Sequence, residues 1–305
     1  GYKRAGFTVL GNVEIDPEVN AVYRKNNHPK FSYEMDLREF NAKEDLPEEL
    51  FNLDILDGSP PCTSFSSAGL RDETWGKEKK FREGQKKQRL DDLFFVFLDT
   101  VEKLKPKIVV AENVVGLVRG KAKGYVHEIV KRFQELGYSV QIFSLNSAHM
   151  DVPQARHRVF FVANRIGLKP LKLDFRFDPI VFGKVRTEAG IPLNEGTVLK
   201  ALADEVKEGE SSLSDVAQRV AGEKNKFFTT YVIGDNDVSC TITSSNRPIR
   251  FYDRSFMSDD DIRRCQTFPA DYDFCGEDPG YICGMSVPPN MMANIAMEIW
   301  EQWLK

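Results

Sequence analysis

Short apolar runs, separated by segments with apolar residues at helical spacing, constrain the first half of this chain most strongly. Runs rich in Val, Ile and Leu that lack polar alternation are typical of strands covered on both faces. Strands that alternate with helices indicate a parallel sheet. The sequence therefore predicts an α/β fold with a doubly wound, mostly parallel sheet. The expected strands are 7–15, 53–56, 108–111, 140–145 and 159–163, and the expected helices are 17–27, 91–104, 125–136 and 290–303.

The later part of the chain suggests a division into three segments. Residues 1–165 and 239–305 carry strand and helix patterns, whereas residues 166–238 are loop-rich with no sustained period. We expect the first and third segments to form one domain and the middle segment to form a small, irregular domain. Residues 159–163 are expected to pair back with the strand that precedes them.

Composition excludes several classes of protein. The chain has 305 residues, 41% hydrophobic and 29% charged, so it can bury a large core. No run approaches the roughly 20 apolar residues of a membrane helix, and no secretory leader is predicted. Five cysteines without a CxxC pair argue against a zinc site or a disulfide framework and favour a reducing compartment. The net charge of −4 gives no indication of a polyanion partner, so any such partner has to be inferred from the charge of local segments.

A cysteine follows one expected strand at the edge where open parallel sheets bind ligands. Cys62 comes six residues after the strand 53–56, directly behind Pro60 and Pro61, which stiffen the approach. A lone cysteine is most often a small apolar core residue, and that interpretation stays open. The mostly polar stretch Thr63–Ser66 does not suit a core strand, so an exposed thiol is favoured.

Two further motifs place charged side chains at strand ends. Glu112 and Asn113 follow one expected strand, and Arg156 and Arg158, spaced by two, share one face of an extended segment. Taken singly, Glu112 is as readily a helix-capping acid, and the arginines a solvated strand end. Together with Cys62 they supply a nucleophile, an acid and anion-stabilising donors at one sheet edge.

These motifs, in this order, resemble those of the cytosine-5 DNA methyltransferases. The resemblance extends over residues 1–165 and again over 240–305. It implies a class I, Rossmann-like catalytic domain, a DNA substrate and S-adenosylmethionine as the methyl donor, with no metal. The residues that carry it are Asp57–Cys62, Glu112–Val114, Gln154–Arg158 and Gly284–Pro289.

The resemblance also implies roles for four catalytic residues. Cys62 would add as a thiolate to carbon 6 of cytosine, which makes carbon 5 nucleophilic. Glu112 would hold ring nitrogen 3 in its protonated form, and Arg158 would hold the ring oxygen and favour the thiolate. Arg156 would brace this cluster and a nearby phosphate. The target base has to be flipped out of the duplex first, at roughly a few kcal/mol.

Donor and DNA contacts are implied in the same way. Glu14 would bind the ribose hydroxyls and Asp36 the adenine amino group, although without the resemblance both are ordinary surface acids. The residues implied for the donor are Glu14, Ile15, Asp36, Leu37, Pro60, Ser286 and Val287. The residues implied for DNA are Ser64, Ser66, Arg71, Arg89, Asn113 and Gln154.

The segment Thr63–Leu90 is locally basic. It holds eight Lys or Arg residues against four acids, in contrast to the net charge of −4 for the chain. Such a segment favours salt-dependent phosphate contacts, and the resemblance favours a lid over DNA with Gly69 and Gly76 as hinges. A solvated loop is the alternative. Residues 166–238 would be the target-recognition domain, and residues 240–274 the return segment that orients it.

Two departures from the family pattern are visible. The chain begins at Gly1 inside what would be the helix after the family's first strand and glycine-rich turn, so an N-terminal truncation is expected. Met285 stands where the closing motif of the family has Asn. Both departures concern the donor site, so they favour weakened donor binding.

The favoured function is a DNA cytosine-5 methyltransferase acting on double-stranded DNA in a bacterial or phage restriction–modification setting. We expect a cytoplasmic monomer without membrane association. The alternative enzyme is a tRNA cytosine-5 methyltransferase with the same motifs, and the alternative without activity is a DNA-binding relative with impaired donor binding. A thiol protease is disfavoured, because the sequence offers no familiar arrangement of His and Asn around Cys62.

Overall fold

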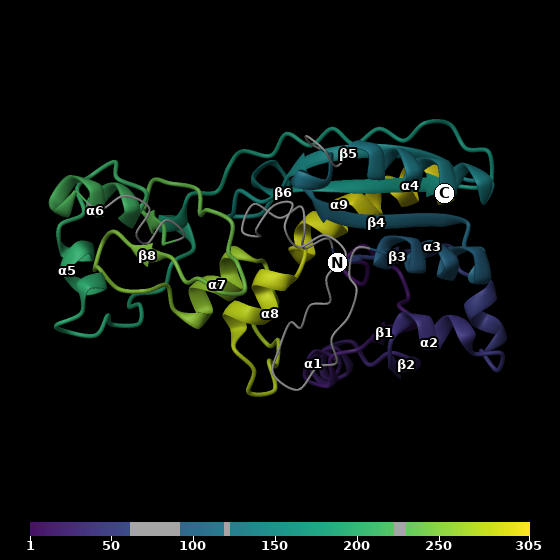
Figure 1. Ribbon diagram of the computed structural model, residues 1–305, viewed down its shortest axis with the longest axis horizontal. Helices are drawn as coiled ribbons and strands as arrows, with labels where there is room; N and C mark the ends of the chain where they lie inside the picture. Colours follow the sequence, from purple (N-terminus) through teal and green to yellow (C-terminus); the bar gives the residue numbers. More distant parts are fainter. Residues whose placement is uncertain (62–91, 119–122, 223–229) are drawn as a thin grey trace. The chain divides into compact units, whose positions relative to one another are not determined.

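The computed structural model describes residues 1–61, 92–118, 123–222 and 230–305 (Figure 1). The chain forms two compact units. The first unit comprises residues 1–8, 146–156 and 174–297, and the second comprises residues 9–145, 157–173 and 298–305. The first unit thus groups residues 174–238 with residues 239–297, while the division at 165 and 238 stays a prediction.

The second unit holds the predicted strands and helices of the first half of the chain. A parallel pair joins β1 to β2, and a four-stranded sheet has the order β3–β4–β6–β5. The first expected strand, 7–15, is shorter than predicted. The elements are β1 (Gly11–Glu14), α1 (Pro17–Asn27), β2 (Phe31–Glu34), α2 (Leu37–Ala42), β3 (Ile55–Gly58), α3 (Leu93–Leu104), β4 (Ile108–Val114), α4 (Lys123–Glu135), β5 (Ser139–Asn146) and β6 (His157–Asn164).

The strand pairing makes the larger sheet mixed rather than mostly parallel. β3 runs parallel to β4, with Ile55 opposite Ile108, but β6 runs antiparallel to β4, with Val110 opposite Val162. The predicted return of residues 159–163 beside the preceding strand is confirmed, since β6 lies next to β5. The expectation of a mostly parallel sheet is corrected by β6, because a return through a short connection reverses the direction of a strand.

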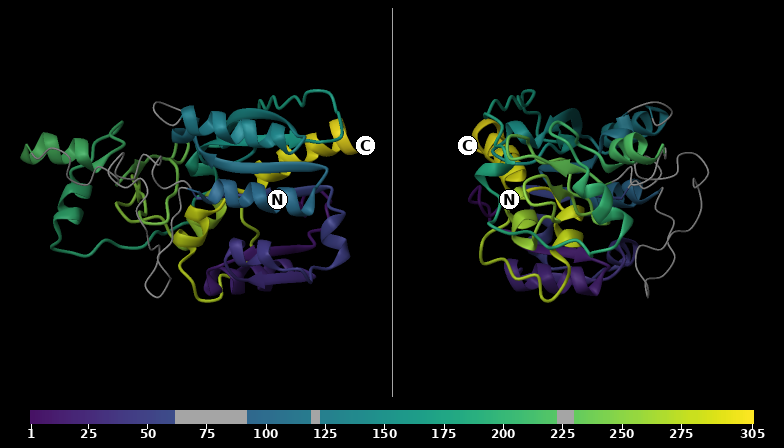
Figure 2. Two further views of the ribbon diagram at one scale, coloured as in Figure 1. Left: turned by 45° about the vertical axis from the view of Figure 1, so that its right-hand side comes forward. Right: turned by 90° about the vertical axis from the view of Figure 1, so that its left-hand side faces the viewer.

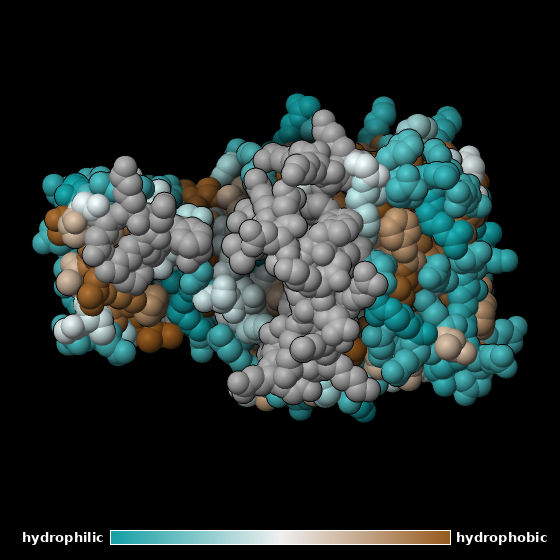
Figure 3. Space-filling view, viewed as in Figure 1, coloured by the Kyte–Doolittle hydropathy of each residue, from teal (hydrophilic) through white to brown (hydrophobic). Residues whose placement is uncertain are grey.

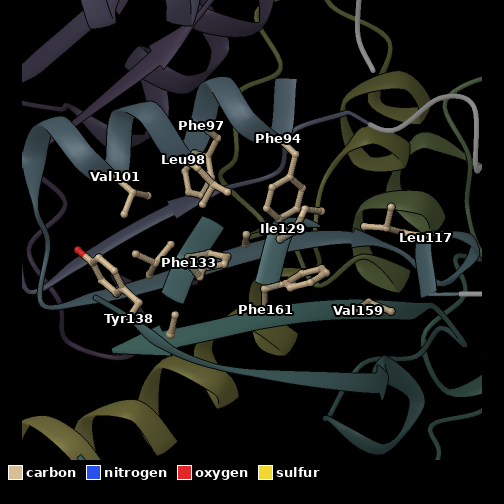
Figure 4. Packing of buried hydrophobic residues seen from close by; sticks show 13 residues of the cluster. Phe94, Phe97, Leu98, Val101, Leu117, Ile129, Phe133, Tyr138, Val159 and Phe161 are labelled. Atoms are coloured by element: carbon tan, nitrogen blue, oxygen red, sulfur yellow. The ribbon is translucent and has the colours of Figure 1, made fainter. Parts of the chain in front are cut away.

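Apolar side chains of α3 and α4 cover one face of this sheet (Figure 4). Phe94 of α3 and Ile129 and Phe133 of α4 belong to one buried cluster with Phe161 of β6. The rings of Phe94 and Phe161 meet edge to face, with centroids 5.2 Å apart. Phe160, on the other face of β6, is also fully buried. Burial on both faces explains why β4 and β6 lack polar alternation.

The helix ends follow local sequence signals. Before α1, the Asp16 carboxylate accepts from the backbone N–H groups of Glu18 and Val19, and Pro17 is the first helical residue. After α4, Gly137 has a φ of 83°, a left-handed conformation that favours glycine.

Figure 2 shows the purple pair β1–β2 with its short helices, and Figure 3 shows hydrophilic side chains over much of the visible surface of the second unit.

Two small apolar cores lie among the described residues of the first unit. One gathers α5 and α6 with Val232 and Ile249, and the other gathers α7 and α8 with Phe182 and Ile233. The elements are α5 (Val198–Asp204), α6 (Leu213–Ala221), β7 (Val232–Ile233), β8 (Ile249–Arg250), α7 (Asp259–Cys265), α8 (Pro279–Met285) and α9 (Pro289–Ile299). The predicted closing helix is confirmed as α9, which passes into a π-helical turn at Trp300–Leu304.

Residues 166–238, which were expected to be loop-rich, contain the helices α5 and α6. Both helices are short, with seven and nine residues, so neither sustains a readable period. Their start signals are present, because the Thr197 and Ser212 side chains accept from the first-turn N–H groups of Lys200 and Ser214. Within the described residues, no helix is long and apolar enough to cross a membrane.

Candidate active site

A partly buried ion pair lies at the carboxyl end of β4. Arg158 Nε lies 2.9 Å from Glu112 Oε1, and each side chain is 15% exposed. Glu112 stands opposite Phe160 on the antiparallel strand β6, so Arg158 is its diagonal neighbour on the same face. Burial lowers the pKa of Arg158 below its usual value, and the Glu112 carboxylate opposes that shift. The structure thus brings these two predicted site residues together.

An amide ties the end of β4 to the segment that follows β3. Asn113 Nδ2 donates to Pro60 O at 3.0 Å, and Asn113 Oδ1 accepts from Val114 N. The Asn113 side chain uses both polar ends inside the protein, and the residue is 4% exposed. It therefore fixes the proline segment that leads to residue 62. A contact of Asn113 with DNA stays a prediction.

Three of the four described cysteines are poor candidates for a nucleophile. Cys265 and Cys283 lie in an apolar core, and burial raises the pKa of Cys240 and Cys283 to about 12. A thiol with such a pKa holds little thiolate at neutral pH. Cys275 is exposed in a turn, with a φ of 55°. Cys62 lies outside the described residues and stays the predicted nucleophile.

Arg156 fixes a backbone junction in the first unit. Its Nη1 donates to Ile242 O at 2.9 Å and its Nη2 to Gly284 O at 2.8 Å, and the residue is 2% exposed. A Cβ atom on Gly284 would collide with the backbone of Thr243 and Ser244, so only glycine permits this approach. This junction explains why a glycine stands ahead of Met285 in the last motif.

The two arginines of the Gln-Ala-Arg-His-Arg motif contact different groups. Arg156 precedes β6, which begins at His157, and its guanidinium contacts Ile242 O and Gly284 O, whereas Arg158 contacts Glu112. That the two arginines share one face stays a prediction. Gln154 is fully buried and accepts from Ile242 N at 3.1 Å through its Oε1. The brace and phosphate contact of Arg156 and the DNA contact of Gln154 stay predictions.

The carboxyl end of β1 places an acid next to an exposed apolar residue. Glu14 Oε1 accepts from Asp16 N at 2.9 Å. Burial raises the pKa of Glu14, and the hydrogen bond from Asp16 partly offsets the rise. Ile15 is 37% exposed. A carboxylate for hydroxyl groups beside an apolar contact for a base fits the nucleoside of S-adenosylmethionine.

Asp36 stands at the end of the adjacent strand β2 and caps α2. Its carboxylate accepts from Arg38 N at 2.8 Å and lies 3.3 Å from Arg38 Nη1. Arg38 Nη2 also lies 2.8 Å from Asp92 Oδ1, just before α3. Leu37 packs against Leu93 and Val96 of α3. The motifs do not include Arg38. Its position two residues after Asp36, the acid predicted to bind the donor, is the feature of the sequence that could have pointed to it.

A buried amide that the motifs also omit organises this edge. Asn20 is 1% exposed; its Oδ1 accepts from Asn12 Nδ2 and Ser32 Oγ, and its Nδ2 donates to Glu34 Oε2. These bonds join β1, α1 and β2. The available signal is an Asn on the buried face of α1, beside the buried Val22.

The last motif lies at the end of α8. Ser286 Oγ donates to Ile282 O at 2.7 Å, and Val287 follows as a half-buried residue. Met285 is 52% exposed, so it fills no core position. The donor roles of Ser286 and Val287 stay predictions.

Several predicted residues lie outside the described ranges: Cys62, Ser64, Ser66, Arg71, Arg89 and the hinge glycines Gly69 and Gly76. The lid that would contain them is therefore an untested prediction. In the part of the chain that the structure describes, no group of His, Cys, Asp and Glu could hold a metal ion.

Solved structures share this fold across nearly the whole chain. A DNA modification methyltransferase encoded within an E. coli prophage matches with a TM-score of 0.70 at 19% identity, over 99% of this chain and 94% of that protein. The S. pombe Dnmt2 methyltransferase matches with a TM-score of 0.60 at 12% identity, over 98% of this chain and 93% of that protein. The chain therefore has a methyltransferase fold.

Sequence comparison defines the family within that class. The profile of the C-5 cytosine-specific DNA methylases matches residues 1–301, so the chain belongs to this family, and the resemblance in the motifs is confirmed. The type II methyltransferase M.FnuDI of Fusobacterium nucleatum is 34% identical over 58% of this chain and 46% of that protein. M1.HphI of Haemophilus parahaemolyticus is 26% identical over 97% of this chain and 82% of that protein. The match thus spans about half the length of the first relative.

Proposed function

We propose that this chain is a DNA cytosine-5 methyltransferase, which transfers a methyl group from S-adenosylmethionine to carbon 5 of a cytosine flipped out of duplex DNA. The observation that carries the proposal is the Glu112–Arg158 pair beside the Pro60 segment. Neighbouring strands deliver an acid, a guanidinium and the approach to Cys62 at one sheet edge. Family membership and the likeness to type II methyltransferases support the reaction.

The catalytic step begins with addition of the Cys62 thiolate to carbon 6 of the ring. This addition turns the ring into an enamine, whose carbon 5 is nucleophilic. Arg158 holds the ring oxygen, and Glu112 in its protonated form holds ring nitrogen 3. Carbon 5 would then take the methyl group that the bound donor supplies. Loss of the carbon 5 proton to water comes last, and it would expel the Cys62 thiolate from carbon 6 and restore the ring.

The ion pair of the free protein places two groups where one edge of the base would enter. Arg158 Nε lies 2.9 Å from Glu112 Oε1. Cytosine carries the ring oxygen next to nitrogen 3, so an entering base offers Arg158 a new acceptor. When the guanidinium turns to that oxygen, Glu112 is left beside nitrogen 3, and the two side chains would hold neighbouring atoms of the ring.

Donor binding uses the ends of the parallel strands β1 and β2. Glu14 would accept from the ribose hydroxyls, Ile15 would contact the adenine ring, and Asp36 would accept from its amino group. Pro60, Leu37, Ser286 and Val287 would complete the contacts. Bound S-adenosylmethionine supplies an electrophilic methyl group. Parallel pairing of β1–β2 and β3–β4 supports a class I, doubly wound layout in which β6 is the reversed strand.

Methyl transfer to two substrates tests the proposed function. Purified protein is mixed with tritiated S-adenosylmethionine and either unmethylated duplex DNA or tRNA, and we expect label in the DNA alone. Cys62→Ser should abolish transfer while duplex binding stays within about threefold, whereas the matched variant Cys275→Ser should behave as wild type. Duplexes carrying 5-fluorocytosine should form an adduct that resists denaturation. Label in tRNA alone, or full activity of Cys62→Ser, would overturn the proposal.

A restriction–modification or phage setting follows from the relatives, which are type II methyltransferases. The proposed partner is double-stranded DNA, bound by a monomer, with residues 166–238 as the target-recognition segment. Expression in an unmethylated host, followed by mapping of methylated cytosines, reads the target sequence directly. Absence of any methylated site would count against activity of this chain.

A further inference from the structure

An arginine of the second unit links the acid proposed for the donor base to the start of another helix. Arg38 Nη1 lies 3.3 Å from Asp36 Oδ2 and 3.4 Å from Asp36 Oδ1, and Arg38 Nη2 donates to Asp92 Oδ1 at 2.8 Å. Asp36 is the N-cap of α2, and Asp92 is the residue before α3; both helices are labelled in Figure 1. One guanidinium therefore joins two acids that belong to different elements.

The Asp36 carboxylate is held by two groups of Arg38. Its Oδ1 accepts from the backbone N–H of Arg38 at 2.8 Å, which is the capping bond of α2. The terminal torsion of an aspartate has a broad energy profile, so a single capping bond leaves the second oxygen some freedom to turn. Arg38 Nη1 restricts that motion, because it lies within hydrogen-bonding distance of both oxygens.

The held carboxylate keeps acceptor capacity for a ligand. Two carboxylate oxygens offer about four lone-pair positions. Among the described residues, Asp36 Oδ2 receives one contact, from Arg38 Nη1. The Asp36 side chain is 18% exposed, so a ligand can reach it. An acceptor fixed in one direction suits an amino group and disfavours a carbonyl oxygen, which offers no proton.

Asp92 holds the far end of the Arg38 side chain. It occupies the N-cap position of α3, but its side chain makes no capping bond to that helix. Its carboxylate accepts from Arg38 Nη2 instead. A long side chain that is fixed at its tip has already lost rotamer freedom before a ligand arrives. Asp92 therefore keeps the Arg38 guanidinium beside Asp36.

Other contacts hold α2 against α3. Asn41 Nδ2 donates to Val96 O at 3.0 Å, and Asn41 Oδ1 accepts from Thr100 Oγ1 at 2.8 Å. Lys103 Nζ donates to Asn41 O at 2.8 Å. None of these bonds involves the Arg38 side chain. Its replacement should therefore change the freedom of the Asp36 carboxylate while the two helices stay packed.

We infer that Arg38 is a positioning residue, which holds the Asp36 carboxylate towards the amino group of the donor base and thereby sets the preference for adenine over a 6-oxopurine. This inference rests on the proposed function, in which Asp36 accepts from that amino group. A site built to hydrogen-bond an N–H group rejects an analogue that lacks it, provided that the acceptor cannot turn away. Arg38 supplies this restraint and needs no contact with the donor itself.

Calorimetry with two forms of the donor product tests the inference on the full chain. S-adenosylhomocysteine carries the amino group, whereas S-inosylhomocysteine carries an oxygen in its place. We expect wild type to prefer the adenosyl ligand by at least about tenfold. Arg38→Met should lower this ratio about fivefold, and Asp92→Asn, which loosens only the far end of Arg38, about twofold.

A double-mutant cycle separates positioning from a general structural effect. Asp36→Ala should remove most of the preference, and Arg38→Met added to it should leave the ratio unchanged, because Arg38 acts through Asp36. The matched control is Arg132→Met. Arg132 Nη2 also contacts two acids of α3, Glu102 at 2.6 Å and Asp99 at 3.5 Å, and this variant should keep the wild-type ratio.

The same preparations are assayed for methyl transfer to DNA, so that two kinds of failure can be distinguished. If wild type transfers methyl groups, a ratio near one in wild type or an unchanged ratio in Arg38→Met would overturn this inference alone. A further fall of the ratio when Arg38→Met is added to Asp36→Ala would also overturn it, because Arg38 would then act independently of Asp36. Wild-type protein that binds neither ligand and transfers no methyl group would overturn the proposed function and the inference together.

Discussion

The sheet of the second unit and a polar cluster of the first unit, formed by the buried pair Arg250 and Asp261 with Thr187, hold their elements together by different means. β4 and β6 share a ladder from Ile108 to Val114 and bury apolar side chains on both faces. Around Arg250, charged and hydroxyl groups join segments whose neighbours lie in different apolar cores. Apolar packing stabilises the fold and appears in the sequence as runs of apolar residues. A polar cluster fixes the relative orientation of the segments that it joins, and no periodic pattern in the sequence marks it.

The largest expected effect tests whether the rim of the sheet carries the chemistry. Glu112→Gln keeps the shape of the side chain but removes the proton donor, so single-turnover methyl transfer should fall by about 10²- to 10⁴-fold. Binding of duplex DNA should stay within about threefold of wild type. The control is Glu128→Gln on the exposed face of α4, which should transfer at the wild-type rate. A rate for Glu112→Gln within tenfold of wild type would contradict the assignment of the catalytic acid to this edge of the sheet.

The next effect measures the strength of the apolar core. Phe161 is fully buried, so Phe161→Ala should lower the free energy of unfolding by about 3–5 kcal/mol in a urea titration. Phe51, which is 46% exposed, is the matched control, and Phe51→Ala should cost less than about 1 kcal/mol. Equal losses at the two positions would contradict the assignment of the core to the sheet and α3–α4.

A smaller effect comes from the buried acid at the donor edge. Burial raises the pKa of Glu14, so its charged form costs stability above that pKa. Glu14→Gln should therefore raise the free energy of unfolding at pH 7 by on the order of 1 kcal/mol while weakening S-adenosylhomocysteine binding. The gain should shrink as the pH falls through the raised pKa towards about 4.3, because wild-type Glu14 is then protonated too. A gain that does not change with pH would show that charge is not its cause.

The smallest effect separates exposed charge pairs from the buried cluster. Lys200 Nζ lies 2.5 Å from Asp204 Oδ2 on the surface of α5. Lys200→Gln should lower the urea midpoint of unfolding only slightly, by much less than Phe161→Ala, since exposed pairs one helical turn apart contribute little. The difference should disappear at about 1 M salt, where the screening length is only about 3 Å. A salt-independent loss would place Lys200 among the structural contacts instead.

Local signals explain which parts of the fold could be predicted. Helix α1 matches its expected range at both ends, because Asp16 and Pro17 act within the first turn. The apolar run of β6 predicts a strand beside β5, but a run of apolar residues carries no information on strand direction. The antiparallel pairing with β4 therefore had to come from the structure.

In the candidate site, too, local signals could be predicted from the sequence and contacts between distant residues could not. Glu112 and Arg158 could be assigned to one edge because each ends or begins a strand that the sequence marks. The partners of Arg156 could not be predicted, since Ile242 and Gly284 lie 86 and 128 positions further along the chain. The contact between Arg250 and Thr187 could not be predicted, because the two residues are 63 positions apart and no period connects them.

The alternation at the end of β4 has a consequence for how this protein can evolve. Glu112 points to the ion pair with Arg158, and Asn113, the next residue, points inward to Pro60 O. Insertion or deletion of one residue ahead of them in β4 would exchange the faces to which the two side chains point. The amide would then lie on the face of the ion pair, and the carboxyl group would point inward. A change in length ahead of Glu112 therefore keeps both side chains on their own faces only when it adds or removes an even number of residues.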